Sequence, residues 1–207
     1  MININDFIEG FSNQFPDENH DQPWIITNGL KGIIEKLILH LDDNYHIGNN
    51  IAIHKTAIVE SGVVIKSPAI VMANCFVGTN AYFRDGVFLD NSVRIGPGCE
   101  IKNSMIFTGT AVAHFNYIGN SIIGRNVNFE AGSIAANHYN ERADKKISVL
   151  YRSQIIETNV EKFGSLVGDN SKIGANAVLS PGTILRKNSV VRRLELIEQI
   201  RYEQDTL

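Results

Sequence analysis

Apolar residues recur at every sixth position along the middle of this chain. Steps of six from Ile47 to Ala113 always reach an apolar residue, and the residue four places after each is also apolar and mostly small. The first series is Ile47, Ile53, Val59, Ile65, Val71, Val77, Phe83, Leu89, Ile95, Ile101, Phe107 and Ala113, and the second is Ile51, Ala57, Val63, Ala69, Cys75, Ala81, Val87, Val93, Cys99, Met105, Ala111 and Tyr117. Turn formers such as Asn, Gly, Ser and Pro are frequent three places after the first series. An amphipathic helix would repeat every 3.6 residues and an ordinary strand every two, so this period predicts a short strand and a corner, repeated.

Three such units form a triangular coil of about eighteen residues, which buries its core only by stacking on the next coil. We therefore predict an all-β fold, a left-handed parallel β-helix, over residues 45–191. The register slips near Ile118 and Ile123 and returns from Val167 to Val191. Residues 138–161 break the pattern, which predicts a loop that leaves the coil, and long ordered loops are usually functional.

The two ends differ from the repeat. In residues 1–44, apolar side chains follow helical spacing: Ile25, Ile26, Leu30, Ile33, Ile34, Leu37, Ile38 and Leu41. We predict a helix from Ile25 to Leu41 that packs over the first coil as a helical cap. The tail, residues 192–207, is predicted to form a short helix from Arg192 to Tyr202, with Leu194 and Ile197 on its apolar side.

Composition excludes some classes of function. The chain of 207 residues has a net charge of -3 and no cluster of basic residues, so we expect no nucleic-acid partner. No apolar run is long enough to cross a bilayer, and the first residues do not resemble a secretory signal, so we expect a cytoplasmic protein without a membrane partner. Cys75 and Cys99 fall within the apolar series and are predicted to be reduced packing residues.

Large polar side chains cluster where the register slips. They occur in HFNYIG at 114–119, in VNFEAGS at 127–133 and in NHYN at 137–140. On spacing alone, a single histidine is more often structural than catalytic, so the cluster by itself leaves both interpretations open.

These segments resemble the acetyltransferase domain of a bifunctional enzyme family. That family joins glucosamine-1-phosphate acetyltransferase to N-acetylglucosamine-1-phosphate uridyltransferase. The resemblance covers roughly residues 47–191 and rests on the hexapeptide pattern, His-x-x-Tyr-x-Gly at 114–119, Val-Asn-x-x-Ala-Gly at 127–132 and Asn137. It implies direct transfer of an acetyl group from acetyl-CoA to an amino-sugar phosphate such as glucosamine 1-phosphate, without a required metal. It also implies a homotrimer with sites between subunits.

The resemblance assigns roles residue by residue. His114 matches the catalytic base and Asn137 the residue that orients the acceptor amine, with main-chain N–H groups near Asn137 and His138 stabilising the oxyanion. Matches to binding residues are Arg84 and Lys102 for the sugar phosphate, Tyr117 and Asn128 for the sugar, and Ala131, His138 and Ser165 for acetyl-CoA. Arg84 and Lys102 are eighteen residues apart, which places them on adjacent coils.

The chain departs from the family pattern at several points. Residues 1–44 are too short for the uridyltransferase domain, so we expect no uridyltransferase activity from this chain. Glu130 and His138 replace the family's Gly and Tyr, which leaves open whether the acceptor is an amino-sugar phosphate or a nucleotide-linked amino sugar. One alternative is a non-catalytic partner or scaffold of a separate sugar nucleotidyltransferase. Another is a zinc hydratase of the γ-carbonic anhydrase kind, but its three converging histidines have no matching His-x4-His spacing here.

Overall fold

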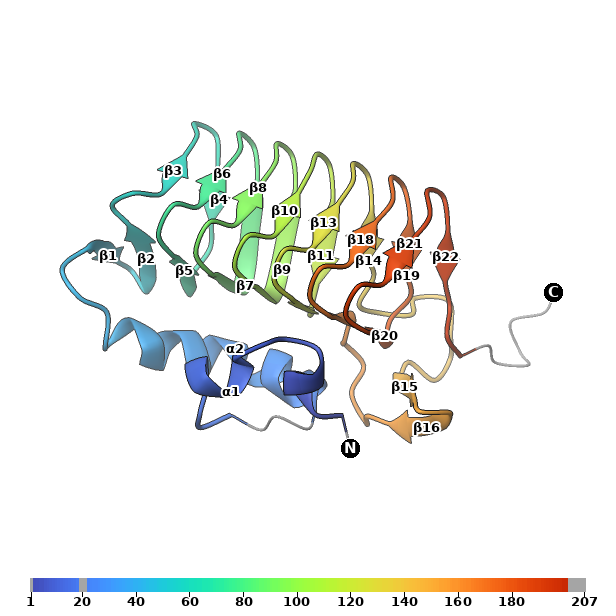
Figure 1. The fold of residues 1–207 in the computed structure, drawn as a ribbon. Helices are drawn as coiled ribbons and strands as arrows, with labels where there is room; N and C mark the ends of the chain where they lie inside the picture. The colour runs from blue at the N-terminus through green and yellow to red at the C-terminus, as the bar shows by residue number, and fades with distance from the viewer. Residues whose placement is uncertain (1, 19–21, 201–207) are drawn as a thin grey trace.

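The chain coils into a parallel β-helix with helices and a hairpin along one side (Figure 1). The structure is a computed structural model, and it describes residues 2–18 and 22–200. Nearly all strand pairs of the coil are parallel, and partners are mostly eighteen residues apart, as between Ala69 and Val87. This confirms the β-helix predicted from the six-residue repeat.

The β-helix has three faces, each built from one short strand of every coil. Face 1 is the seven-stranded sheet β3 (Ile58–Val59), β6 (Phe76–Val77), β8 (Arg94–Ile95), β10 (Ala111–Val112), β13 (Asn128–Phe129), β18 (Lys172–Ile173) and β21 (Val190–Val191). Face 2 contains β4 (Val64–Ile65), the first halves of β7 (Tyr82–Leu89) and β9 (Glu100–Ile106), then β11 (Tyr117–Gly119), β14 (Ile134–Ala135), β19 (Val178–Leu179) and β22 (Leu196–Ile197). Face 3 contains β2 (Ile51–His54), β5 (Ala69–Val71), the second halves of β7 and β9, β12 (Ile122–Ile123), β17 (Ser165–Val167) and β20 (Thr183–Leu185).

Inward side chains stack from coil to coil and form the inner core. On face 3, for example, Val71 pairs with Leu89, Leu89 with Ile106 and Ile106 with Ile123. The two cysteines belong to this core, where both thiols are buried and reduced. A second inward column on face 3 carries hydroxyls, most of which donate to neighbouring main-chain carbonyls instead of packing against carbon. Its members include Ser104, Ser121, Ser165 and Thr183.

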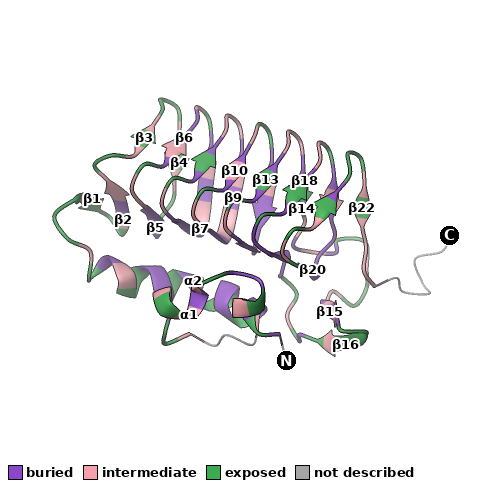
Figure 2. Cartoon of the chain, in the orientation of Figure 1, coloured by how far each residue is buried: buried purple, intermediate pink, exposed green. Residues whose placement is uncertain are grey.

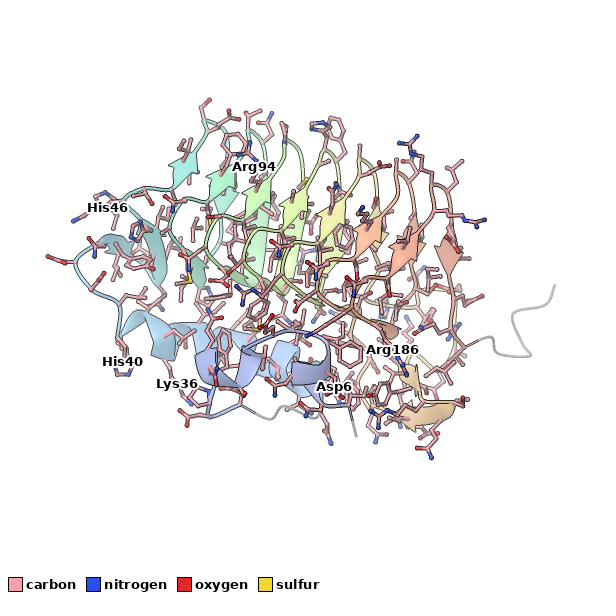
Figure 3. All side chains as sticks on the ribbon, viewed as in Figure 1. Asp6, Lys36, His40, His46, Arg94 and Arg186 are labelled. Atoms are coloured by element: carbon pink, nitrogen blue, oxygen red, sulfur yellow. The ribbon has the colours of Figure 1, made fainter. Side chains whose placement is uncertain are left out.

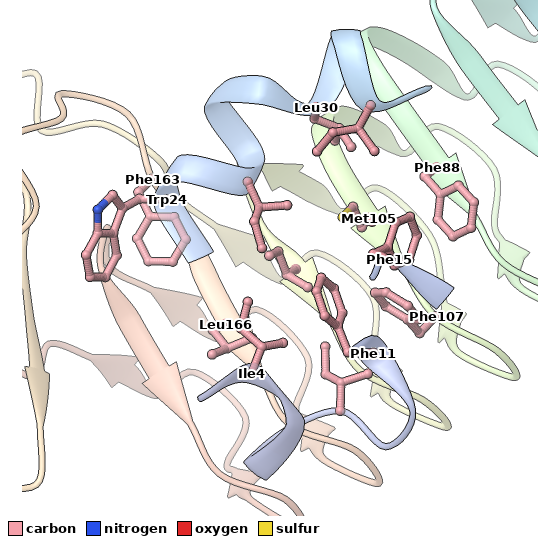
Figure 4. Packing of buried hydrophobic residues seen from close by; sticks show 14 of the residues in the cluster. Ile4, Phe11, Phe15, Trp24, Leu30, Phe88, Met105, Phe107, Phe163 and Leu166 are labelled. Atoms are coloured by element: carbon pink, nitrogen blue, oxygen red, sulfur yellow. The ribbon is translucent and has the colours of Figure 1, made fainter. Parts of the chain in front are cut away.

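Face 3 is also apolar on its outer side, and other parts of the chain cover it. The outward residues are Ala52, Ile70, Phe88, Met105, Ile122, Leu166 and Ile184, all buried. They pack against the 3-10 helix η1 (Ile4–Asp6), α1 (Phe11–Gln14), α2 (Pro23–Ile38) and the hairpin of β15 (Ser148–Tyr151) and β16 (Gln154–Glu157). Buried residues accordingly follow face 3 and the helices beside it (Figure 2), and Figure 4 shows the aromatic rings of this outer core.

The N-terminal helix does not occupy the place predicted for it. Helix α2 lies along the side of the β-helix against β5, β7 and β9, and not over the open end of the first coil. At that end the chain forms a hairpin of β1 (Tyr45–Gly48) with β2, in which Ile47 is 49% exposed. Ile47 therefore does not begin the inner core, because β1 pairs antiparallel with β2 and lies outside the coil, whose first strand is β2.

The predicted C-terminal helix is wrong over its described part. Residues 196–197 form β22, which extends face 2 by pairing with β19. Ile197 packs against the inner core, while Leu194 has a left-handed φ of 60° and is 79% exposed. Residues 201 and 202 of that prediction lie outside the described residues. The tail adds another coil because its spacing continues the six-residue repeat.

The register changes earlier than the sequence pattern indicated. Leu89 pairs with Ile106, seventeen residues on, and Val112 follows as the next inward residue. The predictions that Phe107 and Ala113 face the inner core are therefore wrong: Phe107 packs outward against Phe11 and Phe15, and Ala113 is partly exposed. The same shift turns Met105 and Tyr117 outward. The cause lies at the corner within β7 and β9. Two residues separate Arg84 from Val87 in β7, whereas only Asn103 separates their partners Lys102 and Ser104 in β9.

The chain leaves the coil after Asn137 and rejoins it near Gly164. Residues 138–163, called the excursion below, contain the β15–β16 hairpin and pack against the N-terminal segment, for example through the rings of Tyr151 and Phe7. The excursion closes where the Phe163 N–H donates to the carbonyl of Asn137 at 3.2 Å. Within residues 2–18 and 22–200, no helix has both the length and the apolar character to cross a membrane.

Candidate active site

Most of the residues that the sequence suggested lie on face 2 or at its two corners. The leading corner, residues 113–116 and 130–133, connects face 1 to face 2. The trailing corner, residues 84–87, 102–104 and 119–121, connects face 2 to face 3. Side chains at corresponding positions of a corner lie on adjacent coils, about 5 Å apart.

Arg84 and Lys102 stack at the trailing corner, as predicted from their spacing. Arg84 is in register with Lys102, and Lys102 with Gly119. The corner turns through residues with left-handed φ: Asp85 at 63°, Asn103 at 47° and others of the same kind. Asn and Asp tolerate this conformation better than other side chains, so these residue types permit the tight turn here.

Two carboxylates share the positive charge of this corner. The Arg84 guanidinium contacts Glu100 at 2.7 Å and Asp85 at 3.2 Å, and the Lys102 ammonium lies 3.9 Å from Asp85. Burial lowers the pKa of Lys102, and the nearby charges of Arg84 and Lys162 lower it further. A bound anion would relieve this repulsion between like charges.

A hydrogen-bonded chain of side chains connects face 2 to the trailing corner. The Tyr117 hydroxyl donates to Oδ1 of Asn137 at 3.2 Å, and the Asn137 amide donates to Oδ1 of Asn120. Burial raises the pKa of Tyr117, and the charge of Glu100 adds to this effect. The phenol therefore stays protonated and can act as a donor. Asn137 is 8% exposed, so both partners hold its amide in one orientation.

His114 lies at the leading corner, on the other side of face 2 from Arg84 and Lys102. Its side chain is exposed, and its ring makes no hydrogen bond within the part of the chain described here. Ala131 is its neighbour on the next coil, since the Gly132 N–H donates to the His114 carbonyl at 2.9 Å. No hydrogen bond or ion pair among the described residues joins His114 to the Arg84–Lys102 pair.

The other three suggested residues are dispersed. Asn128 is exposed on face 1 beside Lys172. His138 begins the excursion, and its Nδ1 donates to the carbonyl of Glu161 at 3.2 Å. Ser165 is fully buried in the hydroxyl column of the inner core, and its Oγ has no hydrogen-bond partner among residues 2–18 and 22–200. Its side chain therefore has no open path to a cofactor on the surface.

The structure also places residues at the site that the motifs did not indicate. Asn28 and Lys31 of α2, Asn120 of the coil and Lys162 of the excursion line a cavity with Lys102. The sequence signal of Lys31 and Lys162 is a positive charge on a helix and on an irregular segment, which does not distinguish them from solvated surface lysines. Asn28 and Asn120 belong to no motif that the sequence analysis identified.

Glu130, where the sequence departs from the family, is already paired. Its carboxylate accepts from Arg193 at 2.9 Å and from the Ala175 N–H at 2.9 Å. The hydrogen bond from Arg193 is the main reason why the pKa of Glu130 is lowered. Glu130 therefore bonds to the next coils, away from His114. Within the described ranges, no group of three or more His, Cys, Asp or Glu side chains could hold a metal ion.

Comparison with known proteins places this chain beside bifunctional sugar enzymes. Residues 166–192 match the family model of the hexapeptide repeat of succinyl-transferase. A bifunctional sugar-1-phosphate nucleotidylyltransferase/acetyltransferase of Sulfurisphaera tokodaii is 31% identical over 160 residues, which cover 75% of this chain and 39% of that protein. The bifunctional protein GlmU of Methanococcus vannielii is 34% identical over 157 residues, covering 74% of this chain and 37% of that protein. The chain thus spans less than two fifths of the length of these relatives.

Proposed function

Since the chain belongs to the hexapeptide-repeat proteins related to these bifunctional nucleotidylyltransferase/acetyltransferases, we propose that it is an acetyl-CoA-dependent N-acetyltransferase of an amino-sugar phosphate. These relatives confirm the family resemblance that the sequence analysis drew from the motifs at 114–119 and 127–132. The acceptor, the base and the donor site are the parts that we propose.

The observation that carries this function is the composition of the trailing corner. Arg84 and Lys102 stack on adjacent coils, and the Tyr117–Asn137 pair lies beside them. Convergent cations suit a dianionic phosphate, while a phenol and a fixed amide suit the hydroxyl and amine groups of a sugar. A scaffold protein has no need for either arrangement, which favours the enzyme over the non-catalytic partner.

The proposed reaction is direct acyl transfer. The lone pair of the sugar amine attacks the thioester carbonyl of acetyl-CoA, and His114 accepts the proton that the amine loses. The tetrahedral intermediate then expels the CoA thiolate, which takes up a proton and leaves as the thiol. Main-chain N–H groups of Asn137 and His138 make no hydrogen bond within the described chain, so they remain available to an oxyanion.

We further propose a homotrimer in which neighbouring subunits share each site. His114 and the Arg84–Lys102 pair lie on opposite corners of face 2 in one chain, so a partner that supplies one of the two corners would complete the site. Phe115, beside His114, is 74% exposed, so its ring is available for contact with a neighbouring subunit. Acetyl-CoA would then lie along the leading corner beside Ala131.

The function is tested by release of free thiol from acetyl-CoA. Purified full-length chain is assayed with glucosamine, glucosamine 1-phosphate, glucosamine 6-phosphate and UDP-glucosamine as acceptors. We expect turnover with a phosphorylated amino sugar, and the absence of both turnover and acetyl-CoA binding would favour the scaffold. Mixed trimers of His114→Ala with Arg84→Gln chains should recover part of the activity that each variant lacks. If mixing recovers nothing, the site lies within one subunit.

A further inference from the structure

A polar cavity of about 270 Å³ lies where three separate segments of the chain meet. Helix α2 contributes Asn28 and Lys31, and the excursion contributes Lys162. The trailing corner contributes Asp85, Lys102, Asn103 and Asn120. The cavity therefore lies directly beside the Arg84–Lys102 pair. It also shares Asn120 with the hydrogen-bonded chain that leads through Asn137 to Tyr117.

Helix α2 packs against the coil at this point. A Cβ on Gly86, which has a φ of +102°, would lie 3.4 Å from Cγ of Lys31 and 3.5 Å from its main-chain nitrogen. The neighbouring apolar side chains of α2, Leu30 and Ile34, are fully buried in the outer core. This packing fixes the helix and directs Lys31 to the rim of the cavity.

The cations around the cavity outnumber the carboxylates. Lys31, Arg84, Lys102 and Lys162 carry four positive charges, whereas Asp85 and Glu100 carry two negative charges. Lys31, Arg84 and Lys102 all lie within 4 Å of Asp85, and Lys162 has no ion pair within the described residues. The surplus of two positive charges equals the charge of a phosphate monoester at neutral pH.

We propose that Lys31 and Lys162 bind the acceptor's phosphate together with Arg84 and Lys102, so that the site holds a terminal phosphate monoester. This inference rests on the proposed function, because Arg84 and Lys102 are taken to bind the acceptor. It deepens that function in two respects. Two segments outside the repeat complete the phosphate site. The lysines gather around one cavity, which suits the doubly charged phosphate of a sugar monophosphate better than the two singly charged phosphates of a nucleotide-linked sugar.

The competing interpretation is that Lys31 only anchors α2 to the coil. Its ammonium lies 3.4 Å from Asp85, but the two side chains are 54% and 42% exposed. An ion pair so open to solvent contributes at most about 1 kcal/mol to stability. Substitution of Lys31 should therefore leave the fold intact, and its effect on phosphate can be measured separately.

The test measures binding by calorimetry, without turnover, using the full chain and three probes: inorganic phosphate, glucosamine 1-phosphate and UDP-glucosamine. We expect Lys31→Gln and Lys162→Gln each to raise the Kd of the first two probes about tenfold, the usual worth of a charge-assisted contact. The matched controls are Lys36→Gln, exposed on the same helix (Figure 3), and Lys146→Gln, exposed on the excursion. Each control should change the Kd less than twofold.

Several results would overturn the proposal. One is unchanged phosphate affinity in both variants, combined with a lower thermal midpoint for Lys31→Gln, which is what an anchor predicts. Another is wild-type protein that binds neither inorganic phosphate nor glucosamine 1-phosphate, or that prefers UDP-glucosamine. Acetyl transfer without phosphate binding would leave the acetyltransferase standing and remove the phosphate site. Phosphate binding that depends on Lys31 and Lys162, without any acetyl transfer, would support the phosphate site and contradict the acetyltransferase function.

Discussion

The Tyr117 hydroxyl reaches Oδ1 of Asn137 by passing directly over Gly119. A Cβ on Gly119 would lie 2.5 Å from the Tyr117 oxygen and 2.8 Å from Cγ of Asn137, closer than side chains pack. The hydrogen bond of 3.2 Å between Tyr117 and Asn137 therefore requires a glycine at position 119. Tyr117 belongs to face 2 and Asn137 to the following coil, so this contact fixes the sugar-binding surface across two coils.

Gly119→Ala is expected to separate Tyr117 from Asn137 and to lower kcat/KM roughly tenfold to a hundredfold, as displaced positioning groups commonly do. Steady-state kinetics with glucosamine 1-phosphate measures this loss. The control is Gly48→Ala on β1, where an added Cβ meets nothing within 4 Å. Unchanged kinetics in Gly119→Ala would mean that the Tyr117–Asn137 pair is not part of the site.

His114→Ala should lower kcat about 10²–10⁴-fold, which is the usual contribution of a general base. The thermal midpoint should not change, because the His114 side chain is exposed and its ring bonds to nothing in the described chain. His46→Ala, an exposed histidine on β1, is the control. An effect limited to KM would exclude His114 as the base.

Arg84→Gln should raise KM for a phosphorylated amino sugar by roughly tenfold or more, because a guanidinium binds phosphate oxygens in a way that an amide cannot. KM for acetyl-CoA should stay within about twofold, since the donor site is proposed at the opposite corner. Arg94→Gln removes an exposed arginine from face 1 and provides the comparison. Equal losses for both substrates would contradict phosphate recognition by Arg84.

Phe88→Ala should lower the free energy of unfolding by about 3–5 kcal/mol, as loss of a buried aromatic ring usually does. Phe88 is 3% exposed, and its ring centroid lies 5.4 Å from that of Phe15 and 6.1 Å from that of Phe107. Urea titration measures the change. Leu39→Ala, at 79% exposure just after α2, should stay within about 0.5 kcal/mol. A small effect at Phe88 would mean that the helices do not stabilise face 3.

The Cys75 thiol should resist alkylation by iodoacetamide at pH 8 in the folded protein and react once urea unfolds it. Burial raises the pKa of this thiol to about 11, and only the thiolate is a nucleophile. The unfolded thiol loses its proton near pH 9, so this group favours the fold below that pH, and the stabilisation is lost as the pH rises toward 11. Cys75→Ala should show a smaller loss of stability over this range. Rapid native labelling would contradict the buried position.

The coil itself was predictable from sequence because one inward residue per strand must be apolar, which imposes a period of six. The register was predictable only as far as Ile101. Beyond it, Ile106 and Phe107 are both apolar, since one faces the inner core and the other the outer core. When both sides of a strand are buried, alternation disappears and the pattern no longer indicates which side chain points inward.

The packing of α2 along the side of the β-helix could have been predicted from the sequence, but not from the two apolar series at six-residue spacing. Face 3 carries three consecutive apolar residues in Ala69–Val71 and Val87–Leu89, which indicates burial on both sides of the sheet. The adjacency of Arg84 and Lys102 followed from their spacing. Lys31 and Lys162 could not be predicted, because their proximity depends on how α2 and the excursion fold back onto the coil.

The side-on packing of α2 ties the length of the helix to the number of coils. Trp24 contacts Phe163 near the excursion, and Leu37 lines a groove with Ile70 at the other end of the outer core. From Trp24 to Leu37 the helix is about 20 Å long, at 1.5 Å per residue. Ile70 and Leu166 are four strand spacings apart, roughly 19 Å. A repeat gained or lost between them would put the two lengths out of step, so growth of this solenoid by duplication is confined to the coils outside the helix.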